Sequence, residues 1–463
     1  MNRFQSMGGQ RFRKAIPLVL LPLLILWISG CKTPDAATDA VVDDLTPLGE
    51  FFMESSVFSQ SMTGFALYDP ESGEMLHEHN AQLFYTPASN TKIFTLYAAL
   101  KALPDTLPAL RYTIQNDTLY FRGTGDPTFL NTSFDNDTAY RFLKDREETL
   151  VYYDGHYQDH HFGSGWPWDW YPAPYAPEKA PFPIYGNVMT FQTQQVAMVM
   201  LNEDEPVKPA IFEKYLDNIG WNSDQLALID REFRDNRILY APKADTARQQ
   251  RTIPFVYSTE LFLELLADTL GRDVSYTSRA DLEFDNTVYG IDADSVYKRL
   301  MLISDNLVGE QLLLMMSDEL FGEMNSERAI NHSVSSYFSG LPDTPRWADG
   351  SGLTRYNLMT PRSIVMLLDA LYDEYGAERI LPMFPLGGER GTISGRYRPP
   401  EGEEPFVYGK TGTLRNNNAL SGYVYTASGR RLIFSFVNNN FVVHGNTVIN
   451  EMERALNVVR ERY

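Results

Sequence analysis

The stretch TPASNTKIFTLYAAL, residues 86–100, places a serine three positions before a lysine at the start of an apolar helical pattern. Apolar residues at positions 93, 96, 97 and 100 share one helix face, which predicts a helix over residues 89–102. A serine at such a start is usually an N-terminal cap. Lys92, however, lies on the same face as Ser89 and can reach its hydroxyl. The stretch therefore encodes either a capped helix or a nucleophile with its base.

Two later motifs bear on this choice: SDN at residues 304–306 and KTGT at residues 410–413. Each has an ordinary structural explanation when it stands alone, because serine, aspartate and asparagine are common in turns and caps. Together with Ser89 and Lys92, in this order and each in a suitable kind of element, they indicate one catalytic site.

The chemistry of these residues explains the arrangement. A serine hydroxyl is a weak nucleophile until an adjacent base takes its proton. Lys92 can be that base only when neutral, and burial and the charge of Lys410 would both lower its pKa. The helix start offers the backbone N–H of Ser89 to an oxyanion. A strand carrying KTGT could supply the second N–H, with Gly412 leaving room for the substrate backbone. We therefore interpret Ser89 as a nucleophile.

The remaining motif residues suit proton transfer and binding. Lys410 and the hydroxyls of Thr411 and Thr413 match a terminal carboxylate on the substrate. Ser304 could relay a proton to the leaving amine, and Asn306 could orient the lysine base and the substrate amide.

The same three motifs occur in β-lactamases and penicillin-binding proteins. The chain most resembles the DacB-like family of low-molecular-mass penicillin-binding proteins, which are D-alanyl-D-alanine carboxypeptidases/endopeptidases. The similar segments, in the family's order, are ASNTKIFTLYAAL, RGTGDPTF, SDNLVGEQLL, DGSGLTRYNLMTP, GGERGTISGRY and GKTGTLRNNNALSGY. Residues 166–187 are loosely similar to its Trp-Asp…Tyr-Ala-Pro segment, so the resemblance covers about residues 60–440. The gap of about 215 residues between Ser89 and Ser304 also separates the chain from class A β-lactamases, whose gap is far shorter.

The resemblance implies roles for the motif residues. Ser89 is the implied nucleophile, and Lys92 is its base. Ser304 is implied to relay a proton, and Asn306 to position the reacting groups. The implied substrate-binding residues are Lys410, Thr411, Gly412 and Thr413. The backbone N–H groups of Ser89 and Thr413 would form the oxyanion hole. The segment DGSG, residues 349–352, is either a supporting turn or a substrate contact.

The predicted fold is α/β (α+β), a penicillin-binding transpeptidase-like domain in which an antiparallel sheet packs with helices. Residues 63–80 predict a hairpin, and FVYGKTGTL, ALSGYVYTAS and RRLIFSFVNNN predict three consecutive strands. Short strand candidates such as YTIQ and VAMVML, broken by proline, glycine and aspartate, indicate a β-rich insertion. We therefore predict a catalytic domain split into residues 51–105 and 251–463 around an inserted module of residues 106–250.

The N-terminus has the features of a targeting segment. Basic residues precede the apolar run AIPLVLLPLLILWISG, which is short for a membrane span of ~20 residues. Residues 28–31, ISGC, resemble the lipobox of bacterial lipoproteins, so we expect a signal peptide over residues 1–30, lipidation of Cys31 and an acidic tether over 31–50. Lys32 resembles an outer-membrane signal. A retained membrane anchor and a plain secretory signal are the alternatives.

Composition narrows the partners. The formal charge of −20 argues against nucleic acid and against docking on anionic lipid by charge alone. A single cysteine excludes an internal disulfide. We expect no cofactor, since no glycine-rich phosphate loop stands in a strand-to-helix setting.

Two side features have alternative interpretations. An aromatic cluster could stack on glycan sugars, although aromatics between prolines usually fix a loop to a core; its members are Trp166, Trp168, Trp170, Tyr171 and Tyr175. The run GHYQDHH could indicate a metal site, but without HExxH or paired cysteines an exposed loop is the better interpretation for His156, His160 and His161.

We expect a serine-type D-Ala-D-Ala carboxypeptidase that acts on peptidoglycan stem peptides, is acylated by β-lactams and is held in the bacterial cell envelope by a lipid. A D,D-endopeptidase with the same residues is the nearest alternative. A β-lactamase is less favoured because no glutamate for deacylation is identifiable. An inactive envelope binding protein is also less favoured, because it would not need these residues at the spacing that catalysis requires.

Overall fold

The computed structural model describes residues 47–193, 207–218, 228–241 and 249–463. The predictions for the signal peptide, Cys31 and most of the tether, and the strand candidate VAMVML at residues 196–201, lie outside these residues. Within the described part, no helix has the length and apolarity needed to cross a membrane.

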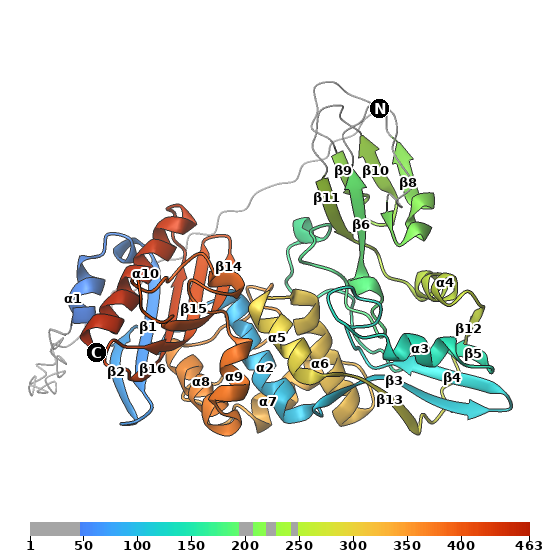
Figure 1. Cartoon of the computed structure of the whole chain (residues 1–463), viewed down its shortest axis with the longest axis horizontal. Coiled ribbons are helices and arrows are strands. Elements are labelled where there is room, and N and C mark those ends of the chain that lie inside the picture. Colours follow the sequence, from blue (N-terminus) through green and yellow to red (C-terminus); the bar gives the residue numbers. More distant parts are fainter. Residues whose placement is uncertain (1–46, 194–206, 219–227, 242–248) are drawn as a thin grey trace, which may run out of the picture. The chain divides into compact units, whose positions relative to one another are not determined.

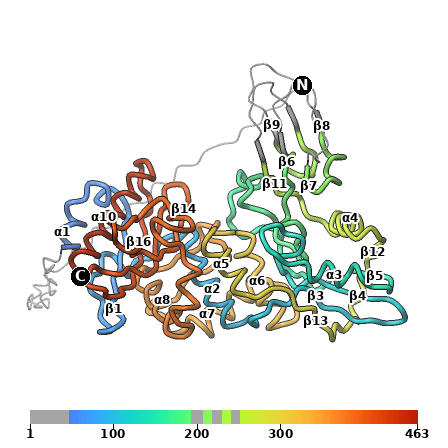
Figure 2. The backbone as a smooth tube through the Cα atoms, viewed as in Figure 1, coloured from blue at the N-terminus to red at the C-terminus, as the bar shows by residue number. Residues whose placement is uncertain are grey.

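An antiparallel sheet of five strands forms the centre of the catalytic part. In spatial order its strands are β14 (Val407–Leu414), β15 (Asn417–Tyr425), β16 (Arg431–Asn439), β1 (Met62–Asp69) and β2 (Glu74–His79). The N-terminal hairpin pairs with the C-terminal strands through β1 and β16, which lie side by side in Figure 2 although they are far apart in the sequence. The predicted fold class is confirmed.

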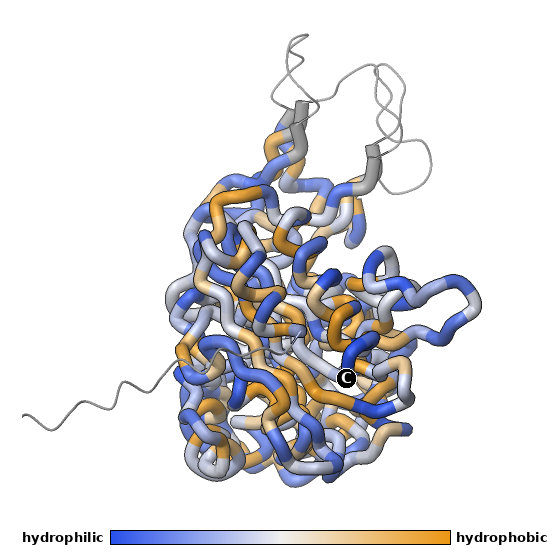
Figure 3. The backbone as a smooth tube through the Cα atoms, turned by 90° about the vertical axis from the view of Figure 1, so that its left-hand side faces the viewer, coloured by the Kyte–Doolittle hydropathy of each residue, from blue (hydrophilic) through white to orange (hydrophobic). Residues whose placement is uncertain are grey.

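Both faces of this sheet are covered, which explains why almost every residue of β1 is buried. Alternate residues of a strand point to opposite faces. Ala66 and Tyr68 accordingly join one hydrophobic core, and Phe65 and Leu67 join another. Figure 1 shows helices on either side of the strands, and most of the loops that protrude in Figure 3 are hydrophilic.

The helices divide between these two cores. One face of the sheet carries α1 (Pro47–Glu54) and α10 (Gly445–Arg462). The opposite face carries α2 (Thr91–Ala102), α5 (Ala293–Leu302), α6 (Asn306–Phe321), α7 (Ser326–Ser336), α8 (Pro361–Tyr375) and α9 (Ala377–Ile380). The helices α2 and α6 pack together, and each begins at one of the catalytic motifs.

Among its described residues, the inserted part contains three sheets and its own hydrophobic core. The largest sheet has, in spatial order, β12 (Val274–Tyr276), β5 (Thr149–Tyr152), β4 (Thr118–Gly123), β3 (Thr106–Gln115) and β13 (Asn286–Asp292). One smaller sheet has, in spatial order, β11 (Gln249–Pro254), β6 (Val188–Thr193) and β7 (Val207–Lys208). The other has β8 (Leu216–Asn218), β10 (Ile238–Ala241) and β9 (Leu228–Arg231). The helices of this part are α3 (Thr138–Lys144) and α4 (Thr259–Leu270).

The sheet topology bears on the domain division. Strands β12 and β13 follow residue 250, yet they pair with β5 and β3 of the predicted inserted module. Helix α4 packs in the same core. The segment 251–292 therefore belongs structurally with the insertion, and the second catalytic segment begins at α5.

Helix α6 joins the two parts. Gln311 at its middle donates from Nε2 to the backbone oxygens of Gly125 and Ala180, both at 2.8 Å, and accepts from the N–H of Ala180 at 3.0 Å. Nearer its end, the buried Asp318 pairs with Arg122 of β4. Because α6 starts at the SDN motif, these contacts fix the motif relative to the inserted part.

Candidate active site

Ser89 lies in a 3-10 turn, Ala88–Asn90, that leads directly into α2. The turn is tight: Ala88 has a left-handed φ of 49°, and a Cβ on Gly352 would stand 2.0 Å from the Ala88 oxygen. Neither the turn nor α2 has a side-chain cap. The hydroxyl of Ser89 instead donates to the carbonyl oxygen of Ser351 at 3.3 Å. This geometry differs from that of an N-terminal cap.

Lys92 is buried one turn further along and contacts three groups. Its Nζ lies 3.1 Å from Ser89 Oγ, 2.6 Å from Asn306 Oδ1 and 2.5 Å from the carbonyl oxygen of Ser351. Burial lowers the pKa of Lys92 to about 8, against the opposing attraction of Asp349 and other nearby carboxylates. A substantial fraction of Lys92 is therefore neutral just below pH 8, with a lone pair available for the Ser89 proton.

Lys410 occupies the other side of the site, on the edge strand β14. Its buried Nζ donates to Ser304 Oγ and to the carbonyl oxygen of Thr411, both at 2.8 Å. Burial first, and the charge of Lys92 second, hold the pKa of Lys410 well below its usual range. Ser304 adopts a left-handed φ of 63°, a conformation that costs free energy in a residue other than glycine.

The KTGT strand packs directly on the nucleophile turn. A Cβ on Gly412 would stand 2.5 Å from the backbone oxygen of Pro87 and 3.1 Å from the backbone nitrogen of Ser89. The sequence prediction assigned this space to the substrate backbone; the structure fills it with the protein's own turn. Thr411 Oγ1 lies 2.8 Å from Thr392 Oγ1, and Thr413 is exposed.

The DGSG segment forms a turn that supports the site. Asp349 is its centre: Oδ1 accepts from the N–H of Gly352 at 2.8 Å, and Oδ2 accepts from the N–H of Thr354 at 2.7 Å and from Trp166 Nε1 at 2.9 Å. The turn presents the carbonyl oxygen of Ser351 to both members of the Ser-x-x-Lys motif. Ser351 is therefore a site residue that sequence reasoning did not assign.

A second residue that sequence reasoning missed is Glu310, four positions after Asn306 on α6. Its Oε1 accepts from the backbone N–H of Ser351 at 2.8 Å, and its Oε2 has no hydrogen-bond partner among the described residues. Burial, reinforced by the negative charge of Asp349, raises the pKa of Glu310 to about 7. The four-residue spacing on one helix face was the available signal.

The aromatic cluster contributes both fixed and exposed rings. Trp166 is bound to Asp349, and the carbonyl oxygen of Tyr175 accepts from Asn306 Nδ2 at 2.8 Å, so this loop contacts two site residues. Trp168, in contrast, is 77% exposed. A cavity of about 420 Å³ is lined by four rings of the cluster, together with Phe233 and other residues; the four are Trp166, Trp168, Trp170 and Tyr171.

The histidine run does not form an exposed loop throughout, as the sequence interpretation had it. His156 is buried with Nε2 3.0 Å from the carbonyl oxygen of Gly123, and His161 Nδ1 lies 2.7 Å from the carbonyl oxygen of Lys179. Only His160 of the three is exposed. Over residues 47–193 and the other described ranges, no group of histidine, cysteine, aspartate and glutamate has the arrangement of a metal site.

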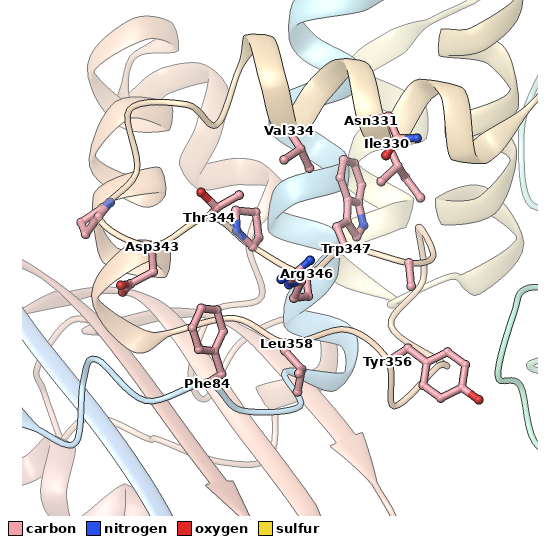
Figure 4. A pocket seen from close by; sticks show the side chains of 13 residues that line it. Phe84, Ile330, Asn331, Val334, Asp343, Thr344, Arg346, Trp347, Tyr356 and Leu358 are labelled. Carbon is pink, nitrogen blue, oxygen red and sulfur yellow. The ribbon is translucent and has the colours of Figure 1, made fainter.

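A larger cavity of about 980 Å³ lies away from the catalytic motifs, beside Phe84, Trp347 and Tyr356 (Figure 4). Trp347 connects this cavity to the site, because its Nε1 donates to the carbonyl oxygen of Asp349 at 2.6 Å. None of the residues of the three motifs lines it.

Comparison with known proteins identifies the family. The model of the D-Ala-D-Ala carboxypeptidase 3 (S13) family matches residues 50–463. The chain belongs to this family. The predicted resemblance and the predicted enzyme class, a serine-type D-Ala-D-Ala carboxypeptidase, are thereby confirmed.

Individual relatives agree with this membership. The D-alanyl-D-alanine carboxypeptidase of Actinomadura sp. (strain R39) is 29% identical over 490 residues, covering 95% of this chain and 88% of the relative. D-alanyl-D-alanine carboxypeptidase DacB of Haemophilus influenzae is 24% identical, covering 82% and 85%. The crystal structure of penicillin binding protein 4 (dacB) from Haemophilus influenzae has the same fold, with a TM-score of 0.71, 19% identity and coverage of 90% of this chain and 99% of that one. A second crystal structure of that protein contains a novel β-lactam.

Proposed function

We propose that this S13-family protein removes the terminal D-alanine from peptidoglycan stem peptides through an acyl-enzyme on Ser89. The observation that carries the proposal is the contact of 3.1 Å between Lys92 Nζ and Ser89 Oγ, with the pKa of Lys92 lowered to about 8 by burial. A lysine in this state can accept a hydroxyl proton near neutral pH.

In the acylation step, neutral Lys92 takes the proton of Ser89 as Oγ attacks the carbonyl carbon of the penultimate D-alanine. The N–H groups of Ser89 and Thr413 receive the oxyanion. Collapse of the tetrahedral intermediate breaks the C–N bond. The proton passes from Lys92 to the leaving amine through Ser304, and free D-alanine departs.

Deacylation reverses the roles. Water attacks the ester carbonyl while Lys92 takes its proton, the bond to Ser89 Oγ breaks, and Ser89 recovers a proton. The shortened peptide leaves with a new carboxylate. Asn306 Oδ1 accepts a hydrogen bond from Lys92 Nζ at 2.6 Å and keeps the Lys92 amine aligned through both steps.

The substrate's terminal carboxylate is proposed to bind Lys410, Thr411 and Thr413. Thr413 is exposed on β14, and the Lys410 ammonium stands one residue from Thr411 on the same strand. A carboxylate there gains charge-assisted hydrogen bonds, which are stronger than those between neutral groups.

β-Lactams are proposed to acylate Ser89 by the same route. Support comes from the neighbouring Haemophilus influenzae structure in complex with a β-lactam. Membership of a D-Ala-D-Ala carboxypeptidase family also fits a location in the cell envelope. We further propose that residues 1–30 are a signal peptide and that a lipid on Cys31 holds the protein at a membrane, the outer one if Lys32 acts as its sorting residue.

The test combines D-alanine release with intact-mass spectrometry of the purified protein after exposure to benzylpenicillin. Native protein is expected to release D-alanine from a pentapeptide and to gain one adduct on Ser89. Ser89→Ala is expected to do neither, while Ser278→Ala, an exposed serine outside the site, behaves as native. Full D-alanine release by Ser89→Ala would refute the mechanism. Rapid drug turnover without an adduct would instead favour a β-lactamase.

A further inference from the structure

A groove of about 630 Å³ lies beside the SDN motif, between the catalytic part and the inserted part. On the catalytic side it is lined by Asp305, Leu307 and Arg299. On the inserted side its walls come from the loop after β4, the segment 174–190, residues 208–210, β11 and the end of α4. Its volume is in the range of sites that enclose an organic ligand of moderate size.

The groove starts next to the catalytic residues. Asp305, one of its walls, stands between Ser304 and Asn306 in the sequence. Pro174 and Pro177, which line the same groove, flank the residue whose carbonyl oxygen accepts from Asn306 Nδ2 at 2.8 Å. The groove therefore borders the SDN motif at Asp305 and at the loop that contacts Asn306.

The walls carry hydroxyl and amide groups with a balanced charge. Asn131, Thr132, Ser133, Thr190, Thr252 and Thr269 supply neutral polar groups. The charged members are two cations, Lys208 and Arg299, and two anions, Asp268 and Asp305, of which Arg299 and Asp305 already form an ion pair of 2.7 Å. Such walls suit a polar chain rich in amide and hydroxyl groups better than an isolated ion or an apolar ligand.

The inference rests on the proposed function, in which Ser304 delivers the proton to the leaving amine. When the substrate is an uncrosslinked pentapeptide, the leaving group is free D-alanine, which is too small to need a groove. When the substrate is a cross-linked peptide, the leaving amine belongs to a second stem peptide with its own sugars. That strand must extend away from Ser304.

We propose that this groove binds the strand attached to the leaving amine of a cross-linked peptide. The catalytic residues are common to both reactions and cannot distinguish them. The groove thus determines how well the protein cleaves cross-links, as an endopeptidase, relative to its release of D-alanine.

The test measures two reactions on each variant: D-alanine release from a pentapeptide and cleavage of a purified cross-linked muropeptide dimer. Ser133→Trp and Lys208→Trp, both at exposed lining positions on different elements, narrow the groove without touching the motif residues. Ser278→Trp, at an exposed position outside the lining, is the matched control. Thermal unfolding of all variants checks that each one is folded.

The expected result is a loss of at least tenfold in kcat/KM for the dimer in both groove variants, with D-alanine release within twofold of native. Equal effects on the two substrates in folded protein, or no effect on either, would overturn the proposal. Native protein that releases D-alanine and never cleaves the dimer would also overturn it while leaving the proposed function intact. If native protein releases no D-alanine, the proposed function fails. The groove is then tested by measuring how tightly the dimer binds to Ser89→Ala and to the double variant that also carries Ser133→Trp. Equal affinities would overturn the groove proposal.

Discussion

The two lysines of the active site are both fully buried, but their surroundings differ. Lys92 has carboxylates nearby: Asp349, Glu310 and Asp305 all raise its pKa against the effect of burial. For Lys410, the identified influences within the described residues are burial and the charge of Lys92, and both lower its pKa. Its hydrogen bonds there go to a hydroxyl and a carbonyl oxygen.

This difference matches the two proposed tasks. Lys92 must gain and lose a proton during each turnover, and the neighbouring carboxylates keep its pKa near the working pH instead of letting burial lower it further. Lys410 must bind an anion, and a buried cation without a counter-charge is costly. The substrate's terminal carboxylate supplies that counter-charge, so its binding relieves an electrostatic cost that the empty site retains.

The largest expected effect comes from removing the proton acceptor. Lys92→Met keeps much of the side-chain volume but has no basic nitrogen, so acylation of Ser89 by benzylpenicillin should slow by ~10²–10⁴-fold, the usual contribution of a general base. Stopped mixing followed by intact-mass measurement gives the rate. A loss below tenfold would mean that another group activates Ser89.

The second expected effect concerns the contact between the two lysine-bearing elements. In Gly412→Ala, the new Cβ would stand 2.5 Å from the Pro87 backbone oxygen, so β14 and the Ser89 turn must separate. Misplacement of reacting groups by about 1 Å can cost roughly 10²-fold in rate, and we expect a loss of that order in kcat/KM for D-alanine release. Gly340→Ala, where nothing lies within 4 Å of the added Cβ, is the control and should retain native activity.

The third prediction tests whether Lys410, unlike Lys92, recognises the terminal carboxylate of the substrate. Native protein should favour a pentapeptide with a free terminal carboxylate over its C-terminal amide by about 10–100-fold in kcat/KM, as expected for hydrogen bonds to a charged group worth ~1.5–3 kcal/mol. Lys410→Met should lose most of this preference, because both substrates then meet a neutral side chain. A preference that persists undiminished in Lys410→Met would assign carboxylate recognition to other groups.

The sequence predicted the parts of this site that depend on local pattern. The helix after Ser89, the strand carrying Lys410 and the order of the three motifs follow from periodicity and spacing, and the structure has α2 and β14 at those positions. Contacts set by packing between distant segments were not predictable. The carbonyl oxygen of Ser351 carries no side-chain signature, and the close approach of Gly412 to Pro87 depends on how β14 meets the turn.

The insertion shows the same limit on a larger scale. Strand β13 pairs with β3 across more than a hundred residues of intervening chain, and its segment has no feature that separates it from the catalytic strands. Nonlocal pairing of this kind is decided by tertiary packing and not by local propensity. The predicted boundary at residue 250 follows the end of the aromatic-rich segment. It therefore falls before β12 and β13, the last two strands of the large sheet in the inserted part.

The smallest expected effect isolates the carboxylates on the Lys92 side. Neutral Lys92 is the reactive form, so the acylation rate should fall as pH drops below about 8, in step with protonation of the lysine. Glu310→Gln removes one nearby negative charge while its amide oxygen can still accept the N–H of Ser351. The pKa of Lys92 should fall, and the acidic limb of the pH–rate profile should shift to lower pH by less than about one unit.

This shift separates an electrostatic role for Glu310 from a purely structural one. Glu310→Ala leaves the Ser351 N–H without its buried acceptor and should lower the rate at every pH by displacing the carbonyl oxygen that holds Lys92. If Glu310→Gln also lowered the rate uniformly, with its acidic limb unmoved, Glu310 would act on the site through the position of Ser351 alone. Burial raises the pKa of Glu310 to about 7, so the acidic limb of the native pH–rate profile should reflect the titration of both Lys92 and Glu310. In Glu310→Gln, this limb should reflect the titration of Lys92 alone.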